Sequence, residues 1–173
     1  REISAITAPD IDWERKRRAR DCFESLRDRL CATCEEIERE HTGQLGERAP
    51  GQFVHTQTKR IDEDGSEAGG GVMSVMKGRV FEKVGVNVST VDGKLSADFA
   101  KTVPGAENDP RFWATSISVI AHMQSPHVPA VHLNTRYMVT NESWFGGGSE
   151  RTPVYPNQAH APHFPAYVPH APP

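Results

Sequence analysis

Residues 131–137 read VHLNTRY, and polar and apolar side chains alternate along this stretch. In an extended strand, successive side chains point to opposite faces of the sheet. One face therefore carries His132, Asn134 and Arg136, spaced about 6.6–6.8 Å apart, and the other face is mostly apolar. The stretch predicts a strand that packs one face on a core. Its polar face is either an ordinary solvent-facing surface or a binding surface built from an imidazole, an amide and a guanidinium.

The preceding segment, residues 112–122, also alternates, and residues 123–130 contain two prolines that are typical of a turn. Folding the two segments back as an antiparallel pair brings one set of polar side chains onto a shared face, although a slip of one residue would reverse the faces. The expected set is Ser118, His122, His132, Asn134 and Arg136. Such a surface suits an anionic ligand, because arginine offers a planar fork to a carboxylate and histidine exchanges protons near neutral pH.

The rest of the chain indicates the fold class. Residues 10–40 show the three- and four-residue spacing of an amphipathic helix. The expected packed face of this helix is Ala19, Cys22, Phe23, Leu26, Leu30, Cys34 and Ile37. Residues 52–61 and 66–93 alternate with a period of two, and Asp92-Gly93 is a strong turn signal. Because the strands follow one another without helices between them, we predict an α+β fold with a large, mainly antiparallel sheet.

Composition argues against several classes of function. The chain has 173 residues, with 20 basic and 23 acidic side chains and a net charge of −3, so nothing supports general nucleic-acid binding. No apolar run approaches the roughly 18 residues that a membrane span needs. The first 21 residues lack the apolar centre of a signal peptide.

The chain has three cysteines, Cys22, Cys31 and Cys34, and the last two form a Cys-x-x-Cys motif. We interpret them as small apolar residues of the helix, because a zinc or redox site needs partners that are not apparent in the sequence. Free thiols and the lack of an export signal predict a cytoplasmic protein.

Glycine runs at residues 69–71 and 146–148 fit neither GxxxxGK[ST] nor GxGxxG, so a nucleotide site is rejected. We interpret them as places where the backbone turns or lies close to something bulky. Trp144 and Phe145, beside the second run, predict a flat hydrophobic wall.

Three blocks of the chain resemble the oxygen-dependent coproporphyrinogen III oxidases of haem biosynthesis. The blocks are AGGGVMSVMKGRVFEKVGVNVSTVDG at residues 68–93, SISVIAHMQSPHVPAVHLNTRYMV at residues 116–139 and WFGGGSERTP at residues 144–153. The resemblance implies an antiparallel sheet flanked by helices, usually in a homodimer. It also implies a tetrapyrrole substrate, coproporphyrinogen III, two propionates of which are oxidised by molecular oxygen to vinyl groups. The products are protoporphyrinogen IX, CO2 and hydrogen peroxide. No organic cofactor is expected. The enzyme either needs a divalent metal or works without one, and both alternatives stay open at this point.

The resemblance also implies roles for individual residues. His132 matches a proton donor, and Arg136 matches a residue that grips a propionate and supports catalysis. The substrate-binding positions are Ser118, Asn134, Thr135 and Arg136, and the positions proposed as metal ligands are His122 and His132. Glu150 stands where the family block WFGGGxDLTP carries an aspartate that is a candidate to hold or deprotonate the pyrrole NH. Its side chain is one methylene longer than that of aspartate, and errors of about 1 Å in position can cost about a hundredfold in rate.

The match covers about residues 15–153, whereas the family continues for well over a hundred residues beyond that point. We therefore expect residues 1–152 to be the N-terminal part of a single, incomplete coproporphyrinogen oxidase-like domain, and we hypothesise that a frameshift truncated it. Residues 153–173 hold seven of the 13 prolines and predict an irregular Pro/His/Ala-rich tail, in which His160 and His163 are less typical of a metal site than of low-complexity sequence. The alternative function is a catalytically inactive tetrapyrrole-binding or interaction protein.

Overall fold

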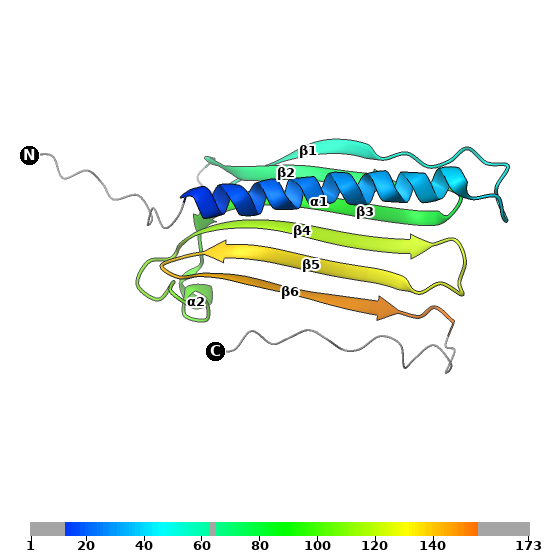
Figure 1. Ribbon diagram of the computed structural model, residues 1–173. Coiled ribbons are helices and arrows are strands. Elements are labelled where there is room, and N and C mark those ends of the chain that lie inside the picture. Colours follow the sequence, from blue (N-terminus) through cyan, green and yellow to red (C-terminus); the bar gives the residue numbers. More distant parts are fainter. Residues whose placement is uncertain (1–12, 63–64, 156–173) are drawn as a thin grey trace, which may run out of the picture.

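The computed structural model describes residues 13–62 and 65–155. Its centre is one six-stranded sheet in which each strand pairs antiparallel with its neighbour in the chain, in the order β1-β2-β3-β4-β5-β6 (Figure 1). The strands are β1 (Val54–Ile61), β2 (Glu67–Met76), β3 (Phe81–Lys94), β4 (Arg111–Met123), β5 (Ala130–Val139) and β6 (Ser143–Thr152). The described residues also form the helices α1 (Trp13–Glu40) and α2 (Ala97–Ala100). The predicted α+β class with an antiparallel sheet is confirmed, whereas His160 and His163 lie outside the described residues.

The long helix α1 lies along one face of the sheet, which we call the covered face (Figure 1). It contacts β3 and β4, and apolar side chains from both layers form the main core. Members of this core include Ala19, Phe23, Val84, Val86, Val88, Ile117, Val119 and Tyr137. The burial of this apolar surface is what holds the helix on the sheet.

The packed stripe of α1 differs in part from the predicted one. Cys22 is exposed and Ile37 is 42% exposed, whereas Cys31 and Glu38 are buried. The buried residues of the helix are Ala19, Phe23, Cys31 and Glu38. Cys22 and Ile37 each come directly before one of these buried residues, and so lie about 100° around the helix from it. The prediction that Cys22 and Ile37 pack on the core is therefore wrong.

The Cys-x-x-Cys motif lies on this packed side of α1, and its two thiols are free. Burial, followed by the neighbouring Cys34, raises the pKa of the Cys31 thiol to about 11. Burial and the nearby carboxylates of Glu35 and Glu38 also raise the pKa of Cys34. Both groups are therefore protonated at neutral pH, which agrees with a packing role and not with thiolate chemistry.

Glu38 lies at the end of α1, is fully buried and organises the turn between β2 and β3. One carboxylate oxygen accepts hydrogen bonds from the backbone N–H groups of Gly51 at 3.0 Å and Arg79 at 2.9 Å. The other accepts from Val80 at 2.8 Å and Phe81 at 2.9 Å. One side chain thereby ties together the helix, the segment that leads into β1 and the β2–β3 hairpin.

The Asp92-Gly93 pair does not form the predicted turn. Both residues belong to β3, where Asp92 pairs with Trp113 and Gly93 pairs with Phe112. The pairing with β4 continues to Lys94, so the long ladder between the two strands overrides the local turn preference of this dipeptide. The chain reverses only after β3, through the segment that contains α2.

The opposite side of the sheet, which we call the open face, is covered only in part by the described residues. A second cluster packs α2 and the loop after it onto one end of this face, and its buried members are Ala100, Val103, Ala106, Ala114 and Met138. Beyond this cluster, the open face exposes Val54, Met73 and Ile120. Within the described residues, no helix is long and apolar enough to cross a membrane.

Candidate functional site

The predicted site residues other than Thr135 meet on the open face, at the centre of β4, β5 and β6. Directly paired residues of antiparallel strands point to the same face. Ser118 pairs with Asn134, and Ser116 pairs with Arg136. On the other side of β5, His132 pairs with Glu150. We call this group the polar patch: Ser116, Ser118, His132, Asn134, Arg136 and Glu150. The register observed between β4 and β5 is therefore the one that the prediction required, and it places Arg136 on the same face as Ser118 and His132.

Arg136 is exposed near the middle of the polar patch. Its neighbours across the two adjoining strands are Ser116 on β4 and Gly146 on β6. Among the residues that the structure describes, its guanidinium has no carboxylate partner and no side-chain hydrogen bond. A free planar fork on an accessible surface is the arrangement that a carboxylate ligand binds most readily.

His132 is held at the edge of the patch by Glu150. The imidazole Nδ1 and the carboxylate Oε1 lie 3.4 Å apart, and both side chains are partly exposed. When the carboxylate accepts the Nδ1–H, the ring presents Nε2 as the atom available to a ligand. Sequence reasoning missed this pairing, although a tight turn at residues 140–142 would have predicted the register of β5 and β6.

The two predicted metal ligands are neighbours but do not complete a metal site. His132 pairs with Ile120, so His122, two residues further along β4, stands one diagonal step from it on the same face, about 7–8 Å away between Cα atoms. Within residues 13–62 and 65–155, no group of three or more His, Cys, Asp and Glu side chains is arranged to hold a metal ion. Two imidazoles are fewer than the three protein ligands that are usual even in an open catalytic zinc site.

Thr135 does not join the other predicted substrate-binding residues. It pairs with Ile117, whose side chain is in the core under α1, so Thr135 points to the covered face. Its hydroxyl donates to the carbonyl oxygen of Gly146 at 3.4 Å. Period-two alternation requires this placement, since Thr135 lies between two residues of the polar patch.

The predicted aromatic wall is wrong for the same reason. Trp144 lies on the open face and packs against the cluster around Met138. Phe145 lies on the covered face and stacks on Tyr137, with ring centroids 4.6 Å apart. Adjacent residues of a strand cannot form one wall.

Two glycines of β6 leave the floor of the patch without side chains. A Cβ built on Gly148 would meet nothing within 4 Å, and one on Gly146 would meet only Trp144 at 4.0 Å. Neither position is therefore glycine because of crowding within the described structure. By contrast, a Cβ on Gly147 would collide with the carbonyl oxygen of Asn134. The open space over Gly146 and Gly148 leaves room for a bulky group to approach the backbone here.

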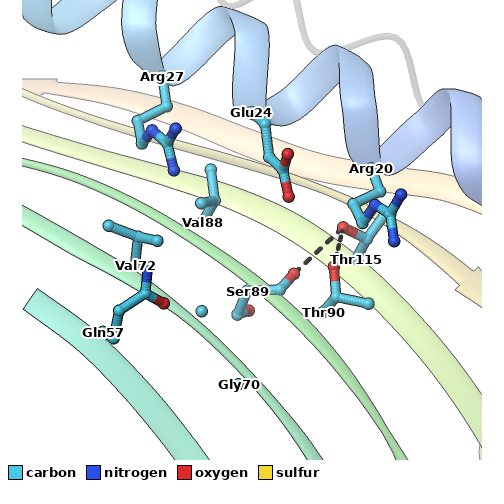
Figure 2. A pocket seen from close by; sticks show the side chains of 11 residues that line it. Arg20, Glu24, Arg27, Gln57, Gly70, Val72, Val88, Ser89, Thr90 and Thr115 are labelled. Atoms are coloured by element: carbon cyan, nitrogen blue, oxygen red, sulfur yellow. Dashed lines mark hydrogen bonds between the residues drawn. The ribbon is translucent and has the colours of Figure 1, made fainter.

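A separate cavity of about 430 Å³ lies between α1 and the covered face (Figure 2). Arg20, Glu24 and Arg27 extend into it from the helix (Figure 2). Its floor includes Gln57, Gly70, Val72, Val88, Thr90 and Thr115. The hydroxyls of Thr90 and Thr115 hydrogen-bond to each other at 2.9 Å.

Each arginine of this cavity is paired with its sequence neighbour, Arg20 with Asp21 and Arg27 with Asp28. No predicted site residue lines this cavity, so the candidate site is the polar patch.

Comparison with known proteins identifies the relatives of this chain. A family model described as coproporphyrinogen III oxidase matches residues 18–171, and so runs past Pro153, where the resemblance seen in the sequence ends. The oxygen-dependent coproporphyrinogen-III oxidase of Rickettsia africae is 49% identical over 148 residues, which cover 86% of this chain and 51% of that protein. The protein of the same name from Rickettsia bellii is 54% identical over 136 residues, or 79% of this chain and 47% of that protein. The chain spans about half the length of these relatives.

Proposed function

Because the chain belongs to the coproporphyrinogen III oxidase family, we propose that it serves the oxygen-dependent oxidative decarboxylation of coproporphyrinogen III to protoporphyrinogen IX. Relatives of about twice its length carry the name of this oxidase. The observation on the molecule itself that carries the proposal is the guanidinium of Arg136, which lies on an open, polar surface and has no partner among residues 13–62 and 65–155. The substrate is a large ring with carboxylate arms, and both of its features have a counterpart in the polar patch.

Binding would begin with the carboxylates. Arg136 would grip one propionate through a charge-assisted, bidentate hydrogen bond. Ser118 and Asn134 would add neutral hydrogen bonds beside it, since they are paired on the same face. The glycine floor at Gly146 and Gly148 would let the ring lie close to β6.

The chemistry needs proton transfer as well as binding. Each propionate loses CO2, one proton and two electrons as it becomes a vinyl group. Oxygen takes up these two electrons with two protons, one of them from the solvent, to form hydrogen peroxide. His132, oriented by Glu150 at 3.4 Å, would exchange a proton through Nε2. Glu150 is also the candidate to hold or deprotonate a pyrrole N–H.

The proposal also covers the cellular location and the oligomeric state of the protein. We propose a cytoplasmic protein, supported by the three free cysteines, and a homodimer, as the family resemblance implies. A divalent metal requirement would appear as activity that a chelator removes and added metal restores.

The first experiment compares wild type with Arg136→Gln. The purified chain is mixed with coproporphyrinogen III and oxygen, and the product is followed by porphyrin fluorescence. We expect the KM for the substrate to rise about 10- to 100-fold in Arg136→Gln, because a hydrogen bond to a charged group is lost. The matched control is Arg29→Gln, an exposed residue of α1 away from the patch, which should behave as wild type.

Two results would contradict the proposal. Equal KM values for Arg136→Gln and wild type would show that Arg136 does not bind the substrate. Tight binding of coproporphyrinogen III by the wild type without turnover would instead identify a catalytically inactive tetrapyrrole-binding protein.

A further inference from the structure

We propose that Asn87 on β3 is a further substrate-binding residue, whose side-chain amide donates a hydrogen bond to an acidic arm of the tetrapyrrole. This inference rests on the proposed function and extends the polar patch by one strand. Neither the alternation along residues 131–137 nor the pairing of β4 with β5 points to it. Only the register between β3 and β4 brings it to the site.

Asn87 lies in one transverse row with two residues of the patch. It pairs with Ser118 on β4, and Ser118 pairs with Asn134 on β5. Paired residues share a face, so all three point to the open side. Neighbouring strands are about 4.8 Å apart, which puts Asn87 and Asn134 about 10 Å from each other across the sheet. A ring with several carboxylates needs polar contacts separated in this way, because its arms leave different sides.

The amide of Asn87 is already oriented before a ligand arrives. Its Oδ1 accepts a hydrogen bond from the backbone N–H of Ser74 at 3.2 Å. This bond uses the acceptor of the amide and leaves Nδ2, which has two hydrogens to donate. Among the described residues, Nδ2 has no side-chain or backbone acceptor, and it lies 3.6 Å from where a Cβ on Gly85 would stand. The free donor is therefore beside another position without a side chain.

The charges of the polar patch indicate which part of the ligand lies near Nδ2 of Asn87. Within the polar patch, Glu150 is the acidic residue and it stands on β6, whereas β3 and β4 contribute amide and hydroxyl groups. Next to Asn87, the hydroxyls of Ser89 and Ser116 hydrogen-bond to each other at 2.9 Å. Acidic arms of the ligand are therefore favoured towards β3, β4 and Arg136, and the pyrrole N–H groups towards Glu150.

The plainer interpretation is that Asn87 only ties β3 to β2. Asn87→Asp separates the two roles, because the aspartate keeps an oxygen for the Ser74 N–H while a carboxylate oxygen replaces the donor. A purely structural residue would tolerate this change. A substrate-binding residue would not, because the new charge repels a propionate.

The test measures the affinity for coproporphyrinogen III without oxygen, so that binding is separated from turnover. We expect Asn87→Asp to weaken binding tenfold or more, with the midpoint of thermal unfolding unchanged. The control is Asn141→Asp, which adds the same charge in the exposed β5–β6 turn and should bind as wild type.

The possible failures are distinguishable. If wild type binds and Asn87→Asp binds equally well, or if Asn141→Asp weakens binding as much, the inference about Asn87 is overturned while the proposed function stands. If wild type does not bind at all, the proposed function fails and the role of Asn87 fails with it.

Discussion

Glu38 shows how one residue can organise contacts far apart in the chain. Its carboxylate accepts four backbone N–H groups, from Gly51, Arg79, Val80 and Phe81. Burial alone raises the pKa of this carboxyl group, but the four hydrogen bonds favour the charged form and bring its pKa below the usual value. The turn between β2 and β3 also needs a glycine at position 78, because a Cβ there would collide with the Glu38 carboxylate.

Glu38→Gln is expected to lower the free energy of unfolding by about 3 kcal/mol, since the new NH2 group faces backbone donors in a buried place. Urea unfolding at pH 7 measures this, and Glu36→Gln, an exposed change on the same helix, is the control. Because the pKa is lowered in the folded state, the stabilisation by Glu38 is fully present above the unfolded value of about 4.3. It is lost as the pH falls through the folded pKa, so the two proteins should converge in acid. Equal stability at pH 7 would contradict this role.

At the scale of the element, β6 carries three consecutive glycines that have different reasons to be there. Gly147 points to the covered face, where a Cβ would collide with the backbone of Asn134. Gly148 and Gly146 point to the open face, where there is room. The alternation of the strand thus separates a glycine required by the fold from two that the fold does not require.

Gly148→Ala and Gly147→Ala form a matched pair of tests. We expect Gly148→Ala to keep or slightly raise the stability, because glycine weakens a strand, and to weaken coproporphyrinogen III binding about tenfold by filling the floor. We expect Gly147→Ala to lower the midpoint of thermal unfolding. Thermal melts and anaerobic binding measure the two effects. Wild-type binding by Gly148→Ala would show that the ring does not lie over β6.

At the scale of the whole molecule, the helix and the sheet depend on one shared core. Phe23 of α1 is 6% exposed and belongs to the cluster that includes Val86 of β3 and Ile117 of β4. The polar patch stands on the reverse side of these same strands. The geometry of the open face therefore depends on the packing of α1 on the covered face.

Phe23→Ala is expected to lower the free energy of unfolding by about 3–5 kcal/mol, through lost burial and the cavity left behind. Helix and sheet should melt together, so far-UV circular dichroism and tryptophan fluorescence should give the same shifted transition. Phe99→Ala, at a residue of α2 that is 56% exposed, should change little. Separate transitions in the two signals would show that α1 is not part of the cooperative unit.

Much of this molecule follows from its sequence, because side-chain alternation is a local property of an extended backbone. The strands, the antiparallel order and the shared face of Ser118, His132 and Arg136 were predictable from period two and one turn. The same rule, applied more strictly, separates Thr135 from its neighbours and Trp144 from Phe145.

Only the tertiary structure decided the long-range neighbours. The pairing of Asn87 with Ser118 crosses the segment that contains α2, and the bonds of Glu38 reach residues about forty positions away. Neither contact leaves a periodic signal, because registers between distant strands and the burial of a charged group depend on how the whole chain closes on itself. Local pattern determined which side chains share a strand face, and packing determined which of them meet.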